Sequence, residues 1–436
     1  MQFDALPPEL VDLVLQHVED GQDSSLKACA SVSKRLRLAA QRRLFESLQI
    51  MPPERRWPPW TPKEAVAELD AVLASSPELT SCVRRLTLST AADSAGQWAV
   101  TDVSGPIARL DRLRMLVIAC DTAYGHPCPW ADIHTATKTA LATRLALATM
   151  RELELRAVPL AGLCELLTLM PARDPELCAP LRLARLSMSM WEGDIIGPQL
   201  RRPPFRIVPD SLMLYVTPLS PLKERLADVI DLSALRHLQV RVKTPADEEF
   251  VQDTLLSHTT RTLAHLWIKL EHFSFDKYTN TPPAGTLTLD ALPALHTLEL
   301  CLAVPWDSDM SFQVLGGSHT STWLRNTLAR IAAASSPIRR LLLWVRVEPN
   351  IAGETSRSLE KVLVDAFEPL VPLLRTWAHA RFEPALTVRL HLPDDVDEVD
   401  PDMRTDALDI VRDVFGELDN SIVVEEEVPC AMRRRI

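Results

Sequence analysis

Short runs in which apolar and polar residues alternate recur along most of the chain. Each run places two or three apolar side chains at every second position, usually after a basic or small polar pair. A period of two predicts a β-strand with one buried face. The apolar positions of the ten runs are Leu86 and Leu88; Leu116 and Ile118; Leu153 and Leu155; Leu186 and Met188; Leu212 and Leu214; Leu238 and Val240; Leu266 and Ile268; Leu298 and Leu300; Leu341, Leu343 and Val345; Val388, Leu390 and Leu392.

The stretches between these runs favour helices. Apolar residues recur at helical spacing over 130–147, 160–170, 247–258, 321–334 and 358–376. A strand followed by a helix about every 30 residues predicts an α/β fold, in which a solenoid with a parallel sheet occupies 61–393. The rival architecture is a doubly wound sheet, which needs longer, fully buried strands and a glycine-rich first turn. The sequence shows neither feature.

The N-terminal segment has a different pattern. Residues 1–50 carry three short apolar series at helical spacing, and we expect a three-helix module too small to be stable without a partner or a neighbouring domain. Residues 51–60 are a proline-rich connector. Thr61 and Glu64 then form a capping box that starts a helix ending near Ser75. The residues expected on one face of that helix are Ala65, Leu69, Val72 and Leu73.

The charge is unevenly distributed along the chain. The 436 residues include 47 Lys and Arg against 58 Asp and Glu, a formal net charge of −11. The segment 394–436 has 14 acids and 5 arginines, a net of −9, so the rest of the chain is nearly neutral. We therefore expect an acidic, partly helical C-terminal segment. A general nucleic-acid or anionic-membrane binder would need a basic surface, so neither partner is expected.

Motifs for catalysis or for cofactor and metal binding were sought and not found. The sequence has no glycine-rich phosphate loop, nucleophile elbow or H-E-x-x-H zinc motif. Cys120 and Cys128 are too widely spaced for a typical metal pair, and the acidic run at 394–398 lacks the glycine and closing glutamate of a calcium loop. We therefore expect no cofactor, no metal and no enzymatic activity. An enzyme with an unrecognised site is the less favoured alternative.

The first 45 residues resemble an F-box. The matching features are Leu6-Pro7-Pro8-Glu9-Leu10, a helix carrying Val14 and Val18, an acidic break, Val32-Ser33-Lys34-Arg35 and Leu44-Phe45. The remaining chain is similar to fungal F-box proteins with degenerate leucine-rich repeats. This resemblance implies an F-box at 1–50 that docks on a Skp-type adaptor, and through it on a cullin scaffold, in an SCF-type ubiquitin ligase. The expected adaptor contacts are Leu6, Pro7, Leu10, Val14, Leu26, Val32, Lys34, Arg35 and Leu36.

The repeats would then hold a target protein. In each strand the position between the two buried apolar residues points to the opposite face of the sheet, and these positions form a row across it. The row comprises Thr87, Val117, Glu154, Ser187, Gln239, Trp267, Glu299, Leu342 and, two residues further along its strand, Trp344. Exposed tryptophans often anchor interfaces. The expected substrate-binding residues are Trp267, Trp344, Glu154 and Glu299, and the alternative is that a flanking helix or loop covers the tryptophans.

Two functional interpretations follow. The first is a substrate-receptor subunit of an SCF-type ubiquitin ligase, and the second is a non-catalytic repeat scaffold whose F-box serves no role in ubiquitination. The eight cysteines are scattered and none forms C-x-x-C. We therefore expect reduced thiols. The sequence also shows no secretory signal and no apolar run of 18 residues, and together these features favour a cytoplasmic or nuclear location.

Overall fold

The computed structural model divides into two compact units, Met1–Ile207 and Val208–Ile436. It describes only part of the chain. The described residues are 10–11, 15, 23–32, 34–51, 61–90, 101–120, 130–171, 180–190, 203–216, 219, 222–223, 225–270, 285–306, 317–333, 337–349, 364, 367–379, 385–391, 401–415 and 422–426. Among the helices of these residues, none is long and apolar enough to cross a membrane.

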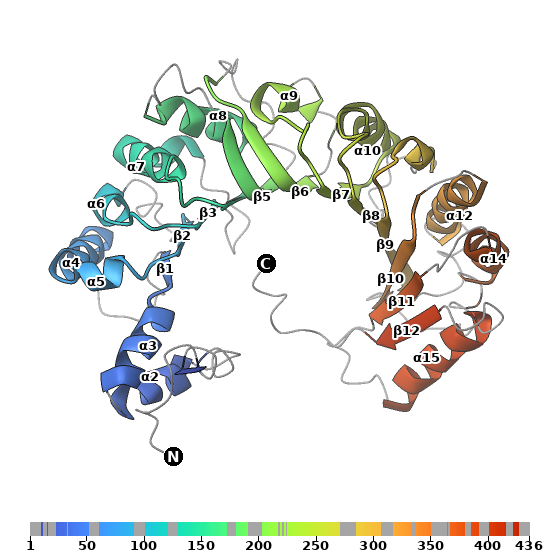
Figure 1. Cartoon of the computed structure of the whole chain (residues 1–436), viewed down its shortest axis with the longest axis horizontal. Helices are drawn as coiled ribbons and strands as arrows, with labels where there is room; N and C mark the ends of the chain where they lie inside the picture. The colour runs from blue at the N-terminus through green and yellow to red at the C-terminus, as the bar shows by residue number, and fades with distance from the viewer. Residues whose placement is uncertain are drawn as a thin grey trace. The chain divides into compact units, whose positions relative to one another are not determined.

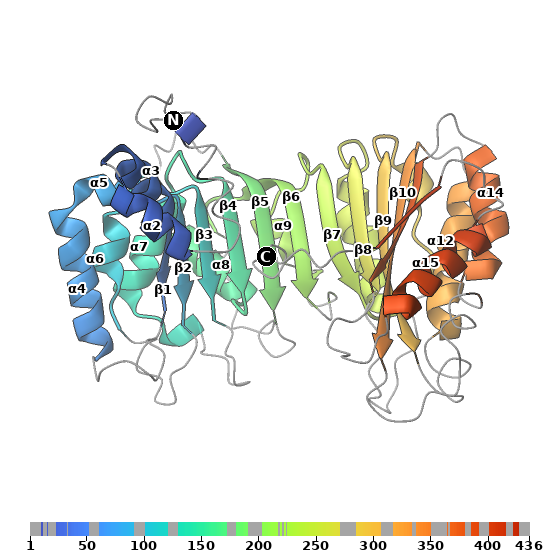
Figure 2. The same ribbon diagram turned by 90° about the horizontal axis from the view of Figure 1, so that it is seen from below.

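The first unit combines a helical N-terminus with a parallel sheet. Each described strand is paired in parallel with the next one along the chain (Figure 2). The strands are β1 (Ser47–Ile50), β2 (Arg85–Ser89), β3 (Met115–Ala119), β4 (Glu152–Arg156) and β5 (Leu181–Met190). The helices are α2 (Asp23–Val32), α3 (Lys34–Leu44), α4 (Pro62–Ser75), α5 (Pro77–Thr80), α6 (Ser104–Ala108), the 3-10 turn η2 (Trp130–Asp132), α7 (Thr135–Leu145) and α8 (Leu160–Leu169).

The second unit repeats the same scheme. Its strands are again parallel, each paired with the next in sequence. They are β6 (Ile207–Val216), β7 (His237–Val242), β8 (His265–Leu270), β9 (Thr297–Trp306), β10 (Arg340–Pro349), β11 (Ala385–His391) and β12 (Ile422–Glu426). The helical segments are α9 (Leu226–Val229), α10 (Pro245–Phe250), the π-helical turn η6 (Val251–Leu256), η7 (Leu289–Ala291), α12 (Gly317–Ala333), η8 (Glu368–Leu370), α14 (Val371–His379) and α15 (Pro401–Phe415).

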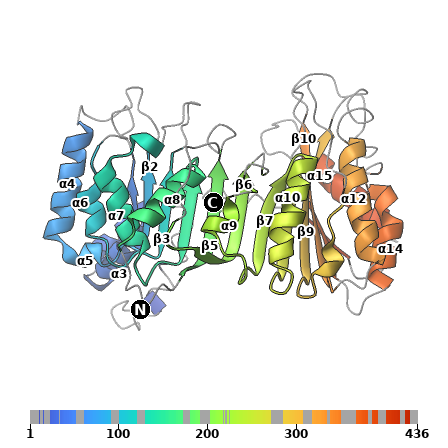
Figure 3. The same cartoon turned by 90° about the horizontal axis from the view of Figure 1, so that it is seen from above.

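In both units the helices cover one face of the sheet. In the first unit α4, α6, α7 and α8 lie along one side of the strands, and in the second α10, α12, α14 and α15 do the same (Figures 1 and 3). The alternating apolar side chains of the strands point to that side and are almost completely buried. This packing removes the apolar faces of strands and helices from water together, which is the main stabilising term of such a layered fold. The predicted α/β alternation and the parallel pairing are confirmed.

The strand register reproduces the spacing of the sequence pattern. In the first unit Leu86, Leu116, Leu153 and Leu186 occupy equivalent positions on neighbouring strands. In the second unit Leu212 begins a corresponding row. That row continues through Leu238, Leu266, Leu298, Leu341 and Leu386. The last copy therefore starts at Leu386, two residues before the predicted Val388.

The helix that follows the connector begins and ends as predicted. Thr61 Oγ1 accepts the backbone N–H of Glu64 at 3.3 Å, and the Glu64 carboxylate accepts the Thr61 N–H at 2.9 Å. The face assignment was wrong in one respect, because Val72 is 45 % exposed whereas Val66 and Leu73 are buried. The spacing of Val66 and Leu73 marks the true buried face.

Two strands were missed, each for a local reason. β1 has only four residues, and one of them, Ile50, is buried. β12 lies inside the acidic segment, where two of its five residues are glutamates, so its apolar half is easily overlooked. The same segment holds the helix α15, in agreement with the expected partial helicity.

Buried carboxylates in the second unit serve the fold. Asp247 is fully buried and accepts backbone N–H groups from Leu219 at 2.5 Å, Lys243 at 3.1 Å and Thr244 at 2.9 Å. Glu248, also buried, accepts backbone N–H groups from Gly285 and Thr286. Each carboxylate thus binds backbone N–H groups of neighbouring segments to α10. These hydrogen bonds compensate for the cost of burying the two acids in an apolar layer.

Candidate functional site

The helix-free face of the second unit brings together three of the predicted target-binding residues and several that were not predicted. Trp267 on β8 lies in register with Glu299 on β9, which lies in register with Leu342 on β10. Trp344 is two residues beyond Leu342 on the same face. The predicted row therefore exists in this unit, and its members are neighbours across three strands.

Glu299 is the centre of a polar cluster on this face. Its Oε2 accepts the indole N–H of Trp344 at 3.0 Å, and His265 Nε2 lies 2.9 Å from its Oε1. The Glu299 side chain is 16 % exposed. Burial raises the pKa of the Glu299 carboxyl, but the His265 contact and charge, the Trp344 bond and the charge of Arg389 outweigh burial and hold the pKa below its usual range.

Trp344 is covered. Only 8 % of this residue is exposed, and the guanidinium of Arg389 lies over its ring at 4.6 Å from the centroid. The prediction of an exposed tryptophan at this position was wrong, because a neighbouring strand supplies a long cationic side chain that stacks on the ring. Trp267, by contrast, is half-buried.

A second cluster surrounds Tyr215 of β6. The Tyr215 hydroxyl donates to Gln239 Oε1 at 3.0 Å, and its ring meets the Trp267 ring edge-on with centroids 6.3 Å apart. The guanidinium of Arg241 lies 4.8 Å from the centre of the Tyr215 ring. These contacts link β6, β7 and β8 on the helix-free face and hold aromatic and cationic groups in fixed positions.

Two histidines complete this surface. His237 on β7 and His265 on β8 are in register, and their rings meet at a steep angle with centroids 5.8 Å apart. Burial, reinforced by the neighbouring charge of His265, lowers the pKa of the His237 imidazole. Sequence reasoning missed both histidines as well as Tyr215, Arg241 and Arg389. His237 and Arg241 lie two residues before and after Gln239 of the predicted row, and His265 lies two residues before Trp267, so extending the row along these strands would have found them. Tyr215 and Arg389 lie on β6 and β11, two strands that the predicted row left out.

Glu154, the fourth predicted target-binding residue, belongs to the first unit. It lies on β4, between Val117 of β3 and Ser187 of β5 in the register. It is buried, and its Oε1 accepts the Arg156 Nε–H at 2.6 Å. Its carboxylate is thus already engaged by a cation of its own strand.

The N-terminal helical module contains the other predicted contacts. Leu26 and Leu36 are buried with Val11 and Leu15 in its core, so they support the module from inside. Leu10 is 45 % exposed and is not one of the residues of that core. Leu6, Pro7 and Val14 lie outside the described residues. Val32, Lys34 and Arg35 border the junction of α2 and α3, and their side chains are not described.

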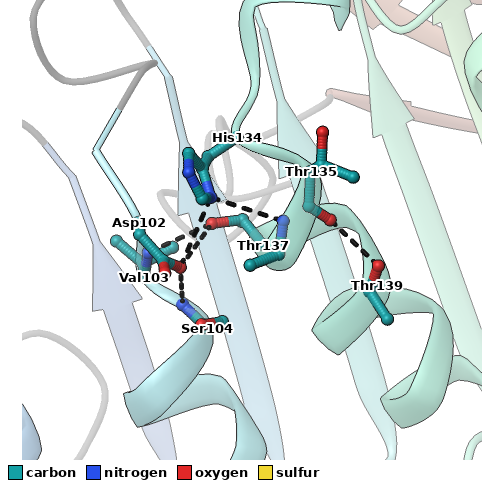
Figure 4. Close-up of polar contacts among 8 residues, drawn as sticks. Asp102, Val103, Ser104, His134, Thr135, Thr137 and Thr139 are labelled. Carbon is teal, nitrogen blue, oxygen red and sulfur yellow. Dashed lines mark hydrogen bonds and ion pairs between the residues drawn. The ribbon is translucent and has the colours of Figure 1, made fainter.

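A carboxylate, a histidine and hydroxyl groups meet at the N-terminal ends of α6 and α7 (Figure 4). Asp102 Oδ1 accepts the backbone N–H of Ser104 at 2.9 Å and lies 3.5 Å from Thr137 Oγ1. His134 Nδ1 accepts the backbone N–H of Ala136 at 3.3 Å and is 3.8 Å from Asp102 Oδ1. Burial raises the pKa of the Asp102 carboxyl, but the Ser104 hydrogen bonds and the His134 charge outweigh it and lower the pKa.

This cluster caps helices and does not form a catalytic triad. A triad histidine donates its Nδ1 proton to the carboxylate, whereas here Nδ1 is the acceptor that caps α7. Thr137 Oγ1 in turn accepts the backbone N–H of Val103, which fixes the start of α6. The residue types match a hydrolase, but their hydrogen-bond roles are those of helix capping.

Comparison with known proteins assigns no family: no protein-family model and no curated protein matches the chain. Within the described residues, no group of three or more His, Cys, Asp or Glu is placed to hold a metal ion. The candidate site is the aromatic and charged surface of β6–β11, which is built by the Tyr215 and Glu299 clusters.

Proposed function

We propose that the chain is a substrate-receptor subunit of an SCF-type E3 ubiquitin ligase. In this proposal residues 1–50 are an F-box that binds a Skp-type adaptor, residues 61–393 are an irregular leucine-rich-repeat-like solenoid, and the helix-free face of the second unit binds a target protein. The chain itself performs no chemistry. It raises the effective concentration of the target beside the ubiquitin-loaded enzyme carried by the cullin.

The observation that supports the adaptor assignment is that some apolar residues of the N-terminal module are buried in its core whereas a neighbouring one is exposed. Val11 and Leu15 face its core, whereas Leu10, next to Val11, is 45 % exposed. Leu10 also belongs to the Leu-Pro-x-Glu-Leu element of the F-box resemblance. An exposed leucine on a module with so small a core is a natural contact for a partner protein.

The charge of α3 supports the same assignment. The sequence of this helix, KRLRLAAQRRL, has five basic residues and no acid. A basic helix beside an apolar contact favours a partner with an acidic surface, because complementary charge speeds encounter and fixes register.

The register of the strands supports the solenoid part of the proposal. Equivalent leucines stack from strand to strand within each unit. The described helices that connect consecutive strands lie on the same face of the sheet in each unit. A helix-free face results, and in the second unit it carries half-buried aromatic and charged groups. Such a surface suits recognition of a protein segment.

Adaptor binding tests the proposal directly. Isothermal titration of the purified full chain with a Skp-type adaptor should show a complex. Burial of an exposed leucine contributes roughly 2 kcal/mol, so Leu10→Asp should weaken binding by about thirtyfold or more. Val72→Asp is the matched control, because Val72 is equally exposed but lies on α4, outside the module.

The control should bind the adaptor as the unaltered chain does. Circular dichroism of both variants checks that the fold is retained. Failure of the unaltered chain to bind the adaptor, or equal losses from Leu10→Asp and Val72→Asp, would contradict the assignment.

A further inference from the structure

The N-terminal helical module passes directly into the sheet (Figure 1). Only Phe45 and Glu46 separate the end of α3 from the start of β1. The Phe45 N–H donates to the Gln41 carbonyl at 2.9 Å, and the Glu46 N–H donates to the Arg43 carbonyl at 3.1 Å. Both residues of this junction are therefore hydrogen-bonded back to the last turn of α3, whose carbonyls have no partner within the helix itself.

The Glu46 carbonyl is also the first hydrogen-bond acceptor of the sheet. It accepts the N–H groups of Arg84 at 2.8 Å and Arg85 at 2.9 Å, at the start of β2. The Arg84 carbonyl in turn accepts the N–H groups of Arg114 at 2.7 Å and Met115 at 3.0 Å, at the start of β3. The same arrangement thus recurs from strand to strand, and Glu46 provides its first member.

β1 stands at the end of the sheet. Among the described strands it is the first in spatial order, and β2 is its partner. It has four residues, of which Ile50, in register with Leu88, is buried. A short strand with a neighbour on one side opens more readily than an interior strand. The position of β1 therefore depends strongly on the helix that holds its N-terminal end.

That helix depends on the module. Leu36, Ala39 and Ala40 of α3 belong to the core of the module, and Leu44 packs against this core. A core of so few residues is only marginally stable. A partner that binds the folded module would stabilise it, and α3 with it, by mass action.

We propose that Phe45 and Glu46 form a stiff joint through which adaptor binding to the module stabilises β1 in the sheet. The inference rests on the proposed function in assigning the adaptor to the module. It adds that the sheet responds to this binding at its first strand. Because Arg84 and Arg85 donate their N–H groups to the Glu46 carbonyl, these two amides report on the joint.

Hydrogen exchange of the full chain, read by mass spectrometry of overlapping peptides with and without a Skp-type adaptor, tests the joint. The adaptor should slow exchange of the Arg84 and Arg85 amides by about fivefold or more. The amides of Arg151 and Glu152 are the internal reference. They make the same kind of bond, at 2.8 and 2.9 Å, to the Arg114 carbonyl between interior strands, so their exchange should not change.

A six-residue glycine–serine insertion between Phe45 and Glu46 should uncouple the two parts. In the free chain it should speed exchange of the two arginine amides by about fivefold or more, because β1 loses its support. It should also abolish the protection by the adaptor, while the adaptor affinity stays within about threefold because the insertion lies outside the core of the module. The matched control is the same insertion between Glu54 and Arg55, which lengthens the connector and leaves the joint intact.

Three results would overturn the inference. They are equal exchange of the arginine amides in the unaltered chain and the junction variant, a bound adaptor that leaves these amides unprotected, or an equal effect of the connector insertion. Failure of the unaltered chain to bind the adaptor would refute the proposed function and the role of the adaptor here. Binding without protection would refute this inference alone.

Discussion

Trp344 on β10 donates its indole N–H to Oε2 of Glu299 on β9 across 3.0 Å. The bond joins two neighbouring strands on the face that carries no helices, and it holds the only described carboxylate of β7–β11 on that face. Arg389 on β11 stacks its guanidinium over the Trp344 ring. Three strands are thereby connected through one aromatic side chain.

Removal of this donor should destabilise the second unit. Trp344→Phe keeps a ring beneath Arg389 but leaves Glu299 without one of its partners, so the free energy of unfolding should fall by about 1–3 kcal/mol. Chemical denaturation measures this loss. Trp267→Phe is the comparison, because the Trp267 indole makes no hydrogen bond to any other residue of the described part of the chain. A larger loss for Trp267→Phe would show that ring size, and not the bond to Glu299, matters.

The depressed pKa of Glu299 makes part of the stability depend on pH. Its carboxyl titrates below the ordinary value of 4.5 in the folded chain. As the pH falls, the Glu299 carboxyl is therefore protonated in the unfolded chain before it is protonated in the folded chain. The ionised carboxylate stabilises the folded chain fully at pH values above the unfolded-state pKa, and this stabilisation is lost as the pH falls through the folded-state pKa. The unfolding free energy of the unaltered chain should exceed that of Glu299→Gln at neutral pH, and the difference should shrink in acid. A difference that stays constant from pH 6 to pH 3 would contradict this assignment.

Gly285 is required by its backbone and its surroundings. Its φ is +72°, and a Cβ at this position would lie 2.5 Å from the backbone oxygen of Trp323. Its N–H also bonds to the buried Glu248 carboxylate at 3.2 Å. Gly285→Ala should therefore cost about 3 kcal/mol or more, since both the backbone conformation and the close contact resist a side chain.

Gly105→Ala provides the contrast for that experiment. The atoms nearest to its Cβ would be those of the Asp70 carboxyl group, with Oδ1 at 3.2 Å, and its φ is not in the left-handed region. The cost should stay below about 1 kcal/mol in the same denaturation assay, because Asp70 needs to shift by only a few tenths of an ångström and its ion pair with Arg109 is largely exposed, so weakening it costs little. Equal losses at Gly105 and Gly285 would show that the close approach to Trp323 is not the cause.

Much of the fold could be predicted because one simple rule governs it. In most repeats two leucines or their equivalents, two residues apart, specify a strand, and the matching leucines stand in register on the next strand. β1 and β12 escaped because a short strand and a strand rich in glutamate lack that pattern. Val72 was misassigned because two choices of helical face differ by one residue, and only packing decides between them.

The site was predicted in part. Trp267, Glu299 and Trp344 were found because they stand beside the repeating leucines. The hydrogen bond between Trp344 and Glu299 was not predicted, because it joins diagonal neighbours on two strands. Whether Trp344 is exposed depends on Arg389, which lies 45 residues further along the chain and is brought beside it only by the register of β10 and β11. Such contacts depend on how side chains pack between strands, and this packing cannot be deduced from the pattern of apolar positions alone.

Assembly of the ligase tests the central claim most directly. Size-exclusion chromatography with light scattering, applied to the full chain mixed with a Skp-type adaptor and a cullin N-terminal fragment, should show one complex containing all three proteins. Omission of the adaptor should leave the cullin separate, and Leu10→Asp should remove the chain from the complex while Val72→Asp does not. Elution of the unaltered chain apart from an intact adaptor–cullin complex would contradict the account.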